Sequence, residues 1–222
     1  RRILATAIGR IRAKLKWRPV VFELMADEFT LFELQRTVAA VLGPHLPDTA
    51  FRAPDAPEPC VGNPFGRQWF PVPWLDGSSE AAAAASLATS ARDLDFYLDA
   101  VLEEEGISPS QCCLLGFSQG TMMALHVAPR RPEPFAGIVA FSGRLLSPDR
   151  LAAEAVSKPP VLLLHGDADQ VVPFGDMGRA GRALAEAGFE VSGHVMRGTG
   201  HGIAPDGLSE ALRFLHDCLY GT

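Results

Sequence analysis

Residues 114–120 read Leu114-Leu115-Gly116-Phe117-Ser118-Gln119-Gly120 and set one serine between two glycines at the end of an apolar run. Such a run is typical of a buried strand, and the segment from Thr121 to His126 fits a helix. A serine between the two is the pattern of a nucleophile elbow, a sharp turn that lifts the hydroxyl above a sheet. The flanking glycines are expected where a side chain would collide with the neighbouring strand or helix. The segment therefore predicts an α/β fold with Ser118 as candidate nucleophile.

A second apolar run, residues 160–164, opens into a loop that carries two acids, Asp167 and Asp169. Loops at the carboxyl ends of parallel strands are where such folds place their chemistry. Asp169 is the candidate for the acid that orients a catalytic imidazole, whereas Asp167 is expected to hydrogen-bond the turn or to cap the next helix. The alternative is that both are turn acids.

His201 lies in Gly198-Thr199-Gly200-His201-Gly202, after a strand predicted over residues 189–196. Glycines on both sides free the backbone to swing the imidazole over the sheet edge, which makes His201 the candidate general base. The remaining histidines fall within helix, strand or surface patterns and are interpreted as structural: His45, His126, His165, His194 and His216.

The order Ser118, Asp169, His201 is the one described for α/β-hydrolases. Further segments match one family within that fold: Phe51-Arg52-Ala53-Pro54-Asp55-Ala56-Pro57, Arg67-Gln68-Trp69-Phe70, His165-Gly166-Asp167-Ala168-Asp169 with Val172-Pro173, and Gly200-His201-Gly202. From about His45 to its end, roughly four fifths of its length, the chain resembles the phospholipase/carboxylesterase family, which includes bacterial carboxylesterases and acyl-protein thioesterases.

This resemblance implies a serine esterase in which Ser118, Asp169 and His201 form the triad and acyl transfer proceeds in two steps through an acyl-enzyme. It places one oxyanion-hole donor on the backbone N–H of Gln119. It also places Trp69, Phe70 and Val172 in the substrate pocket, although Trp69, Phe70 and the nearby Trp74 could equally be core aromatics. The expected substrates are small to medium carboxylic esters or thioesters, and no metal or organic cofactor is required. Thr121 stands where such enzymes commonly have another glycine.

The N-terminal region departs from the family pattern. Where the family has a His-Gly-rich loop, this chain reads Phe22-Glu23-Leu24-Met25, so Leu24 falls at the position of the second oxyanion donor. Loss of those glycines makes the required backbone approach harder. The alternative function is therefore a catalytically impaired or non-catalytic esterase-fold scaffold.

Residues 1–42 also resemble the winged-helix segment that follows the Nudix fold in some bacterial regulators, through Arg10 to Trp17, Pro19 to Leu24 and Phe29 to Gln35. The resemblance predicts an atypical helix-strand-helix unit over residues 1–44 and a chimeric chain. The alternative is an esterase whose first unit has diverged in sequence.

Charge is distributed unevenly along the chain. Residues 1–18 carry seven Arg or Lys and no acid, while the whole chain has a net charge of −6. Leu4, Ile8, Ile11 and Leu15 recur at helical spacing, which predicts a basic amphipathic helix. Docking of this helix on the esterase body is favoured over binding to a membrane or to nucleic acid. No secretory signal and no apolar run long enough to span a membrane is found, so a cytoplasmic protein is expected.

The rest of the chain alternates strands and helices. Strands are predicted over residues 111–115, 138–141, 161–164 and 189–196, and helices over 79–105, 119–128, 174–187 and 205–219. This alternation favours one α/β-hydrolase domain over residues 1–222, with a mainly parallel sheet covered on both faces. Residues 54–73 are predicted to be an ordered loop with short extended pieces. The expected partner is a small-molecule ester and no nucleic acid, in a monomer or homodimer.

Overall fold

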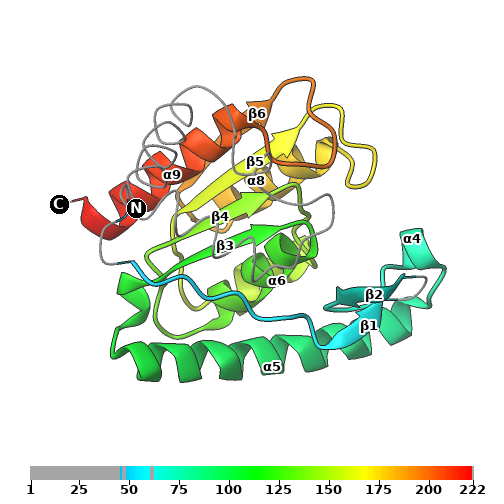
Figure 1. Ribbon diagram of the computed structural model, residues 1–222, viewed down its shortest axis with the longest axis horizontal. Coiled ribbons are helices and arrows are strands. Elements are labelled where there is room, and N and C mark those ends of the chain that lie inside the picture. The colour runs from blue at the N-terminus through cyan, green and yellow to red at the C-terminus, as the bar shows by residue number, and fades with distance from the viewer. Residues whose placement is uncertain (1–45, 47–48, 61–62, 222) are drawn as a thin grey trace, which may run out of the picture.

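Four parallel strands form the central sheet of the computed structural model, which describes residues 46, 49–60 and 63–221. Their order is β3-β4-β5-β6, with bounds Cys113–Phe117, Gly137–Phe141, Val161–Gly166 and Val191–Met196. Each neighbouring pair is parallel, and helices connect the strands (Figure 1). The predicted α/β fold with a parallel sheet is confirmed.

Successive residues of β4 explain why both faces of the sheet are covered. Ile138 and Ala140 belong to one hydrophobic cluster and Val139 and Phe141 to another, as expected when side chains alternate between the faces of a strand. The first cluster includes residues of α5 (Glu80–Glu105), α6 (Gln119–Val127), α7 (Pro148–Glu154) and α8 (Gly175–Glu186). The second includes residues of α9 (Pro205–Tyr220), which lies on the opposite side of the sheet from α6 and α8 (Figure 1).

The long helix α5 begins and ends at the residues that the sequence predicts. The Ser79 hydroxyl caps it by accepting a hydrogen bond of 3.1 Å from the Ala82 N–H. Gly106 ends it in the left-handed conformation, with φ of 63°, which suits a residue without a Cβ. Local capping chemistry thus sets both ends of the helix.

Residues 54–73 are more regular than predicted. They contain an antiparallel hairpin of β1 (Glu58–Cys60) and β2 (Asn63–Gln68), followed by the short helix α4 (Pro73–Asp76). The side chain of Arg67 donates to the carbonyl oxygens of Ala56 and Pro57, at 2.6 and 2.7 Å, and so ties the second strand to the approach of the first. The many prolines and glycines of this segment favour loops, so the strands could not be recognised in the sequence.

The remaining short elements, which the sequence analysis did not predict, are α7 and the 3-10 turns η1 (Pro109–Gln111) and η2 (Ala128–Arg130).

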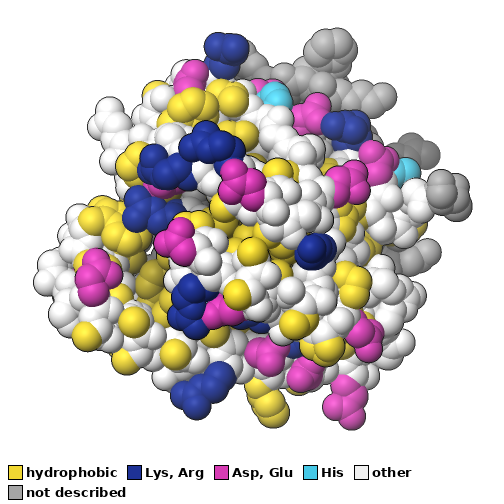
Figure 2. All heavy atoms as spheres, turned by 180° about the vertical axis from the view of Figure 1, so that it is seen from behind, with side chains coloured by type: hydrophobic (Ala, Val, Ile, Leu, Met, Phe, Trp, Pro, Cys, Tyr) yellow, Lys and Arg dark blue, Asp and Glu magenta, His cyan; other side chains and the backbone are white. Residues whose placement is uncertain are grey.

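The predicted N-terminal unit of residues 1–44, including Leu24, lies outside the described residues. Within the described part of the chain, no helix is long and apolar enough to cross a bilayer. Figure 2 shows the face behind that of Figure 1, where basic and acidic side chains are interspersed among apolar ones.

Candidate active site

Ser118 occupies a strained turn between β3 and α6. Its backbone has φ of 54° and ψ of −115°, a conformation that L residues adopt only when their surroundings enforce it. The Ser118 N–H donates to the Phe141 carbonyl at the end of β4, at 3.0 Å. A Cβ at Gly116 would lie 2.3 Å from the Thr121 nitrogen and 2.4 Å from the Gly120 carbonyl carbon. The sharp turn therefore requires glycine at position 116, as predicted.

Gly120 differs from that expectation. A Cβ at this position would meet no atom of the described residues within 4 Å, and the φ of Gly120 is not positive. The collision predicted for the second glycine of the motif is therefore absent from the described part of the molecule. The backbone of Gly120 itself crowds position 116, whereas the side-chain position of Gly120 faces open space among the described residues.

Thr121 is buried and stabilises the elbow through its side-chain hydroxyl. Its hydroxyl lies 2.8 Å from the Gly116 carbonyl oxygen and 2.7 Å from that of Phe141, so it links the ends of β3 and β4. Its methyl group fills the space beside Gly143, where an added Cβ would lie 2.3 Å from Thr121 Cγ2. The departure from a family glycine is thus accommodated by a second glycine, at position 143.

Asp169 lies in the loop after β5, and its carboxylate is fully enclosed. One oxygen accepts the N–H groups of Val171 and Val172, at 2.8 and 2.9 Å, and the other lies 2.8 Å from Nδ1 of His201. Burial by itself raises the pKa of Asp169, but the hydrogen bonds from His201 and from the two backbone N–H groups outweigh it, and the net pKa is lowered. Asp169 is therefore held as an acceptor facing His201.

His201 lies between Asp169 and the elbow. Because a carboxylate accepts at Nδ1, the proton is on Nδ1 and Nε2 is the free basic nitrogen. The imidazole centroid is 4.9 Å from that of Phe117, the residue before Ser118. Among the described residues, no hydrogen bond joins His201 to the Ser118 hydroxyl, and such contacts commonly tighten only when substrate binds.

The loops of Asp169 and His201 are joined through their backbones. The Ala168 N–H donates to the Thr199 carbonyl at 3.0 Å, and the Gly198 N–H donates to the Asp167 carboxylate at 2.6 Å. Asp167 thus accepts a hydrogen bond from the His201 loop, whereas the sequence predicted a bond within its own turn or a cap on the next helix. A Cβ at Gly166 would lie 2.2 Å from the Thr199 oxygen, so this glycine permits the close approach of the two loops.

His165, interpreted from the sequence as structural, is buried against the candidate acid. Its Nε2 lies 3.0 Å from the Val172 carbonyl oxygen and 3.3 Å from the Asp169 carboxylate. A carbonyl oxygen can only accept, so Nε2 carries a proton and supports the loop around Asp169. The sequence offered one indication of this contact, which is that His165 stands four residues before Asp169.

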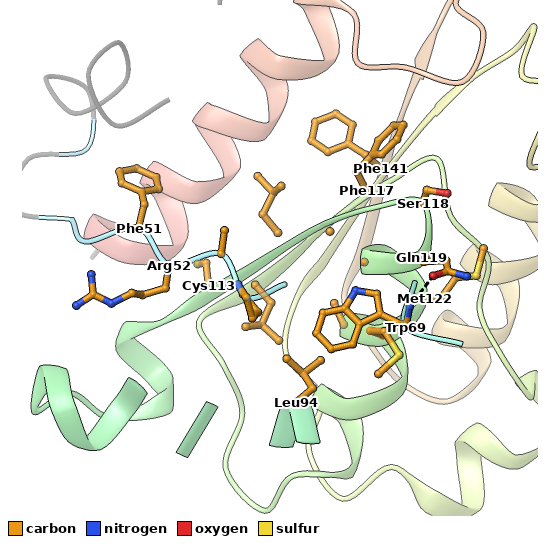
Figure 3. A pocket seen from close by; sticks show the side chains of 18 of the residues that line it. Phe51, Arg52, Trp69, Leu94, Cys113, Phe117, Ser118, Gln119, Met122 and Phe141 are labelled. Carbon is orange, nitrogen blue, oxygen red and sulfur yellow. Dashed lines mark hydrogen bonds between the residues drawn. The ribbon is translucent and has the colours of Figure 1, made fainter. Parts of the chain in front are cut away.

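A cavity of about 1310 Å³ opens beside the elbow, and both Ser118 and Gln119 line it. Figure 3 shows Ser118 and Trp69 toward one end of it and Phe51 and Arg52 toward the other.

Trp69, Val172 and Trp74 also lie on the wall of this cavity. Phe70 does not: it is 4% exposed and packs in the core. The two residues lie in a bend directly after β2, where Trp69 faces the cavity and Phe70 faces the core.

The side chain of Gln119 makes a contact that the sequence analysis missed. Its Oε1 accepts the Trp69 N–H at 2.9 Å, and its Nε2 donates to the Phe70 carbonyl at 2.8 Å (Figure 3). No local pattern could reveal this pairing, because the partners are about fifty residues apart.

Within the described part of the chain, no group of three or more His, Cys, Asp or Glu residues could hold a metal ion.

Comparisons with known proteins agree with this architecture. A model of the Phospholipase/Carboxylesterase family matches residues 37–219. The chain is 30% identical to Esterase YpfH of Escherichia coli K12 over 173 residues, which are 78% of this chain and 71% of that protein. It is 29% identical to Acyl-protein thioesterase 1 of Saccharomyces cerevisiae over 180 residues, 77% of this chain and 78% of that protein.

Among solved structures, that of esterase PE8 is similar with a TM-score of 0.77 and 43% identity, covering 83% of this chain and 86% of the other. The comparisons lend no support to the predicted winged-helix resemblance of the first 42 residues, nor to a chimera. They support a hydrolase that acts on esters. With the family model matching most of its length, the chain belongs to the phospholipase/carboxylesterase family.

Proposed function

We propose that this protein hydrolyses carboxylic esters or thioesters by two-step acyl transfer through Ser118. The observation that carries the proposal is the meeting of residues from three separate loops. His201 Nδ1 lies 2.8 Å from the buried Asp169 carboxylate, and the same imidazole packs on Phe117, next to Ser118 at the strained turn. A serine, an imidazole and an orienting acid in this arrangement are the parts of an activated nucleophile.

In the first step, the Ser118 oxygen forms a bond to the carbonyl carbon while its proton passes to Nε2 of His201. Asp169 stabilises the imidazolium that results and keeps Nδ1 protonated. The tetrahedral intermediate then collapses: the bond to the leaving alcohol or thiol breaks, and that group takes the proton from His201. Water repeats the attack on the acyl-enzyme and releases the acid and free Ser118.

The oxyanion of the intermediate is proposed to be received by the backbone N–H of Gln119. This N–H belongs to the first turn of α6, where helical N–H groups have no partner within the helix and the helix dipole favours negative charge. The second donor assigned from the family pattern, Leu24, lies outside the described residues and stays a prediction.

The cavity wall favours an apolar acyl group. Trp69, Val172 and Met122 line the cavity together with Ser118, so an acyl chain attached to the serine would contact apolar side chains. Moderately apolar esters of small to medium size are therefore the proposed substrates.

Hydrolysis of p-nitrophenyl butyrate and of a butyryl thioester by the purified protein tests this proposal. Ser118→Ala should abolish both activities and also covalent labelling by a fluorophosphonate probe. Ser209→Ala is the matched control, because Ser209 is an exposed serine of α9 whose hydroxyl bonds the Pro205 carbonyl of its own helix. A folded parent protein that neither hydrolyses nor labels would contradict the proposal and favour the scaffold alternative.

A further inference from the structure

The side-chain amide of Gln119 connects the elbow to the segment that carries Trp69. It uses both of its polar atoms: Oε1 accepts from the Trp69 N–H at 2.9 Å, and Nε2 donates to the Phe70 carbonyl at 2.8 Å. Figure 3 shows Gln119 and Trp69 facing each other beside Ser118. Two hydrogen bonds from one rigid, planar group hold the segment in both position and orientation.

The same segment is held from its other side by α5. The Trp69 carbonyl accepts from the hydroxyl of Ser90, which is 1% exposed, and more distantly, at 3.5 Å, from that of Ser86. The N–H and the carbonyl of Trp69 are therefore both occupied, one by α6 and one by α5. Because these groups are part-buried, freeing either of them would cost free energy, which keeps the indole at a defined place on the cavity wall.

An amide side chain can make both contacts at this position at any pH, because it always carries one donor group and one acceptor oxygen. A carboxylate accepts but does not donate, so it would satisfy the Trp69 N–H and place its second oxygen against the Phe70 carbonyl. A methionine would fill a similar volume with no strong donor or acceptor. The two hydrogen bonds thus favour glutamine over ionised glutamate and over methionine, which have a similar size but lack the donor or both groups.

Main chain and side chain of residue 119 face two different parts of the proposed reaction. The N–H is the proposed oxyanion donor, and the amide holds the Trp69 wall against which an acyl chain would pack. We propose that Gln119 is a positioning residue that couples acyl-chain recognition at Trp69 to oxyanion stabilisation at its own backbone N–H. This inference rests on the proposed function.

Kinetics of four variants with p-nitrophenyl acetate and p-nitrophenyl hexanoate test the coupling. Gln119→Met removes both hydrogen bonds and should lower kcat for acetate by about tenfold to a hundredfold, because small displacements of a catalytic group are costly. It should also reduce the preference between the two acyl chains, measured as the ratio of their kcat/KM values. Ser90→Ala loosens Trp69 alone, so it should shift that ratio in the same direction and leave kcat for acetate within about threefold of the parent.

The pH dependence of Gln119→Glu separates a positioning role from a merely structural one. A protonated carboxyl group can donate and accept as the amide does, whereas the carboxylate cannot. The kcat of this variant relative to the parent at the same pH should therefore rise as the pH falls from 8 to 5.5. Dividing by the parent value at each pH removes from the comparison every pH effect that the variant and the parent share. Ser209→Ala serves again as the control, since Ser209 is exposed on α9 and its hydroxyl bonds the Pro205 carbonyl.

The outcomes separate the two proposals. A parent that hydrolyses esters and labels with fluorophosphonate, with Gln119→Met and Gln119→Glu kinetically like Ser209→Ala, overturns the coupling and leaves the proposed function intact. A parent that neither hydrolyses nor labels overturns both. If Gln119→Met does not fold, as judged by circular dichroism, then an unchanged acyl preference in Ser90→Ala and a pH-independent ratio in Gln119→Glu overturn the coupling.

Discussion

Gly143→Ala should destabilise the parent protein strongly and a Thr121→Gly background only weakly, because the two residues share one space beside the elbow. In the parent, the new Cβ would lie 2.3 Å from Cγ2 and 2.4 Å from Cβ of Thr121, and 2.9 Å from the Ser118 carbonyl oxygen. The φ of Gly143 is not positive, so its backbone accepts alanine without strain. The collision with Thr121 is thus the main obstacle to the substitution.

The magnitudes follow from these contacts. Overpacking typically costs about 1–3 kcal/mol, and Thr121 is stiff at χ1 and hydrogen-bonded, so about 3 kcal/mol is expected for Gly143→Ala. Thr121→Gly loses a buried hydrogen bond worth about 1 kcal/mol and a buried methyl worth about 0.8 kcal/mol. It also places a glycine in α6, at about 1 kcal/mol. The double variant should be more stable than additivity predicts by about 2 kcal/mol, within the range for residues in contact.

Urea-induced unfolding of the parent, both single variants and the double variant measures this coupling. Gly181→Ala is the control: its Cβ would lie 3.6 Å from Leu163 Cδ1, an ordinary contact, so this helical substitution should be neutral or stabilising. Additivity of the free energies of unfolding to within about 0.5 kcal/mol would refute the packing argument.

Three predictions concern the Asp169 and His201 loops. Asp169→Asn should lower kcat by about 10⁴-fold, because an amide no longer holds His201 in the required tautomer; an ester assay showing less than a tenfold loss would count against this role. Gly166→Ala would place a Cβ 2.2 Å from the Thr199 oxygen and 2.5 Å from that of Gly200, so it should displace the His201 loop and lower kcat by about a hundredfold, and parent-like kinetics would contradict this. The folded-state pKa of Asp169 is lowered, so its stabilisation is present above the unfolded pKa of about 3.9 and is lost as the pH falls through the lowered folded-state pKa; Asp169→Asn should flatten the fall in unfolding free energy between about pH 5 and pH 2, and equal slopes would exclude this linkage.

Local sequence rules account for much of the fold. The predicted helix over residues 79–105 depends on a serine cap and a terminal glycine, both of which act within one turn. The strands β4 and β5 were found because continuous apolar runs are typical of strands buried on both faces. The hairpin of residues 58–68 was missed because its proline-rich composition also fits a loop.

The candidate site was predictable only in part. Ser118, Asp169 and His201 could be proposed from their motifs and order, and the structure brings their loops together, while their catalytic roles stay a prediction. Phe70 could not be separated from Trp69, because a sequence does not say which of two neighbours faces a cavity.

The sequence by itself determined the elements whose causes are local: the glycine at position 116 that permits the elbow, the capped helix α5 and the alternation of strands and helices. Only the tertiary structure decided the contacts between distant segments, such as the amide of Gln119 on Trp69 and the methyl group of Thr121 against Gly143. The reason is physical. Caps and turns depend on atoms a few residues apart, whereas packing and buried hydrogen bonds depend on which surfaces meet after the chain has folded.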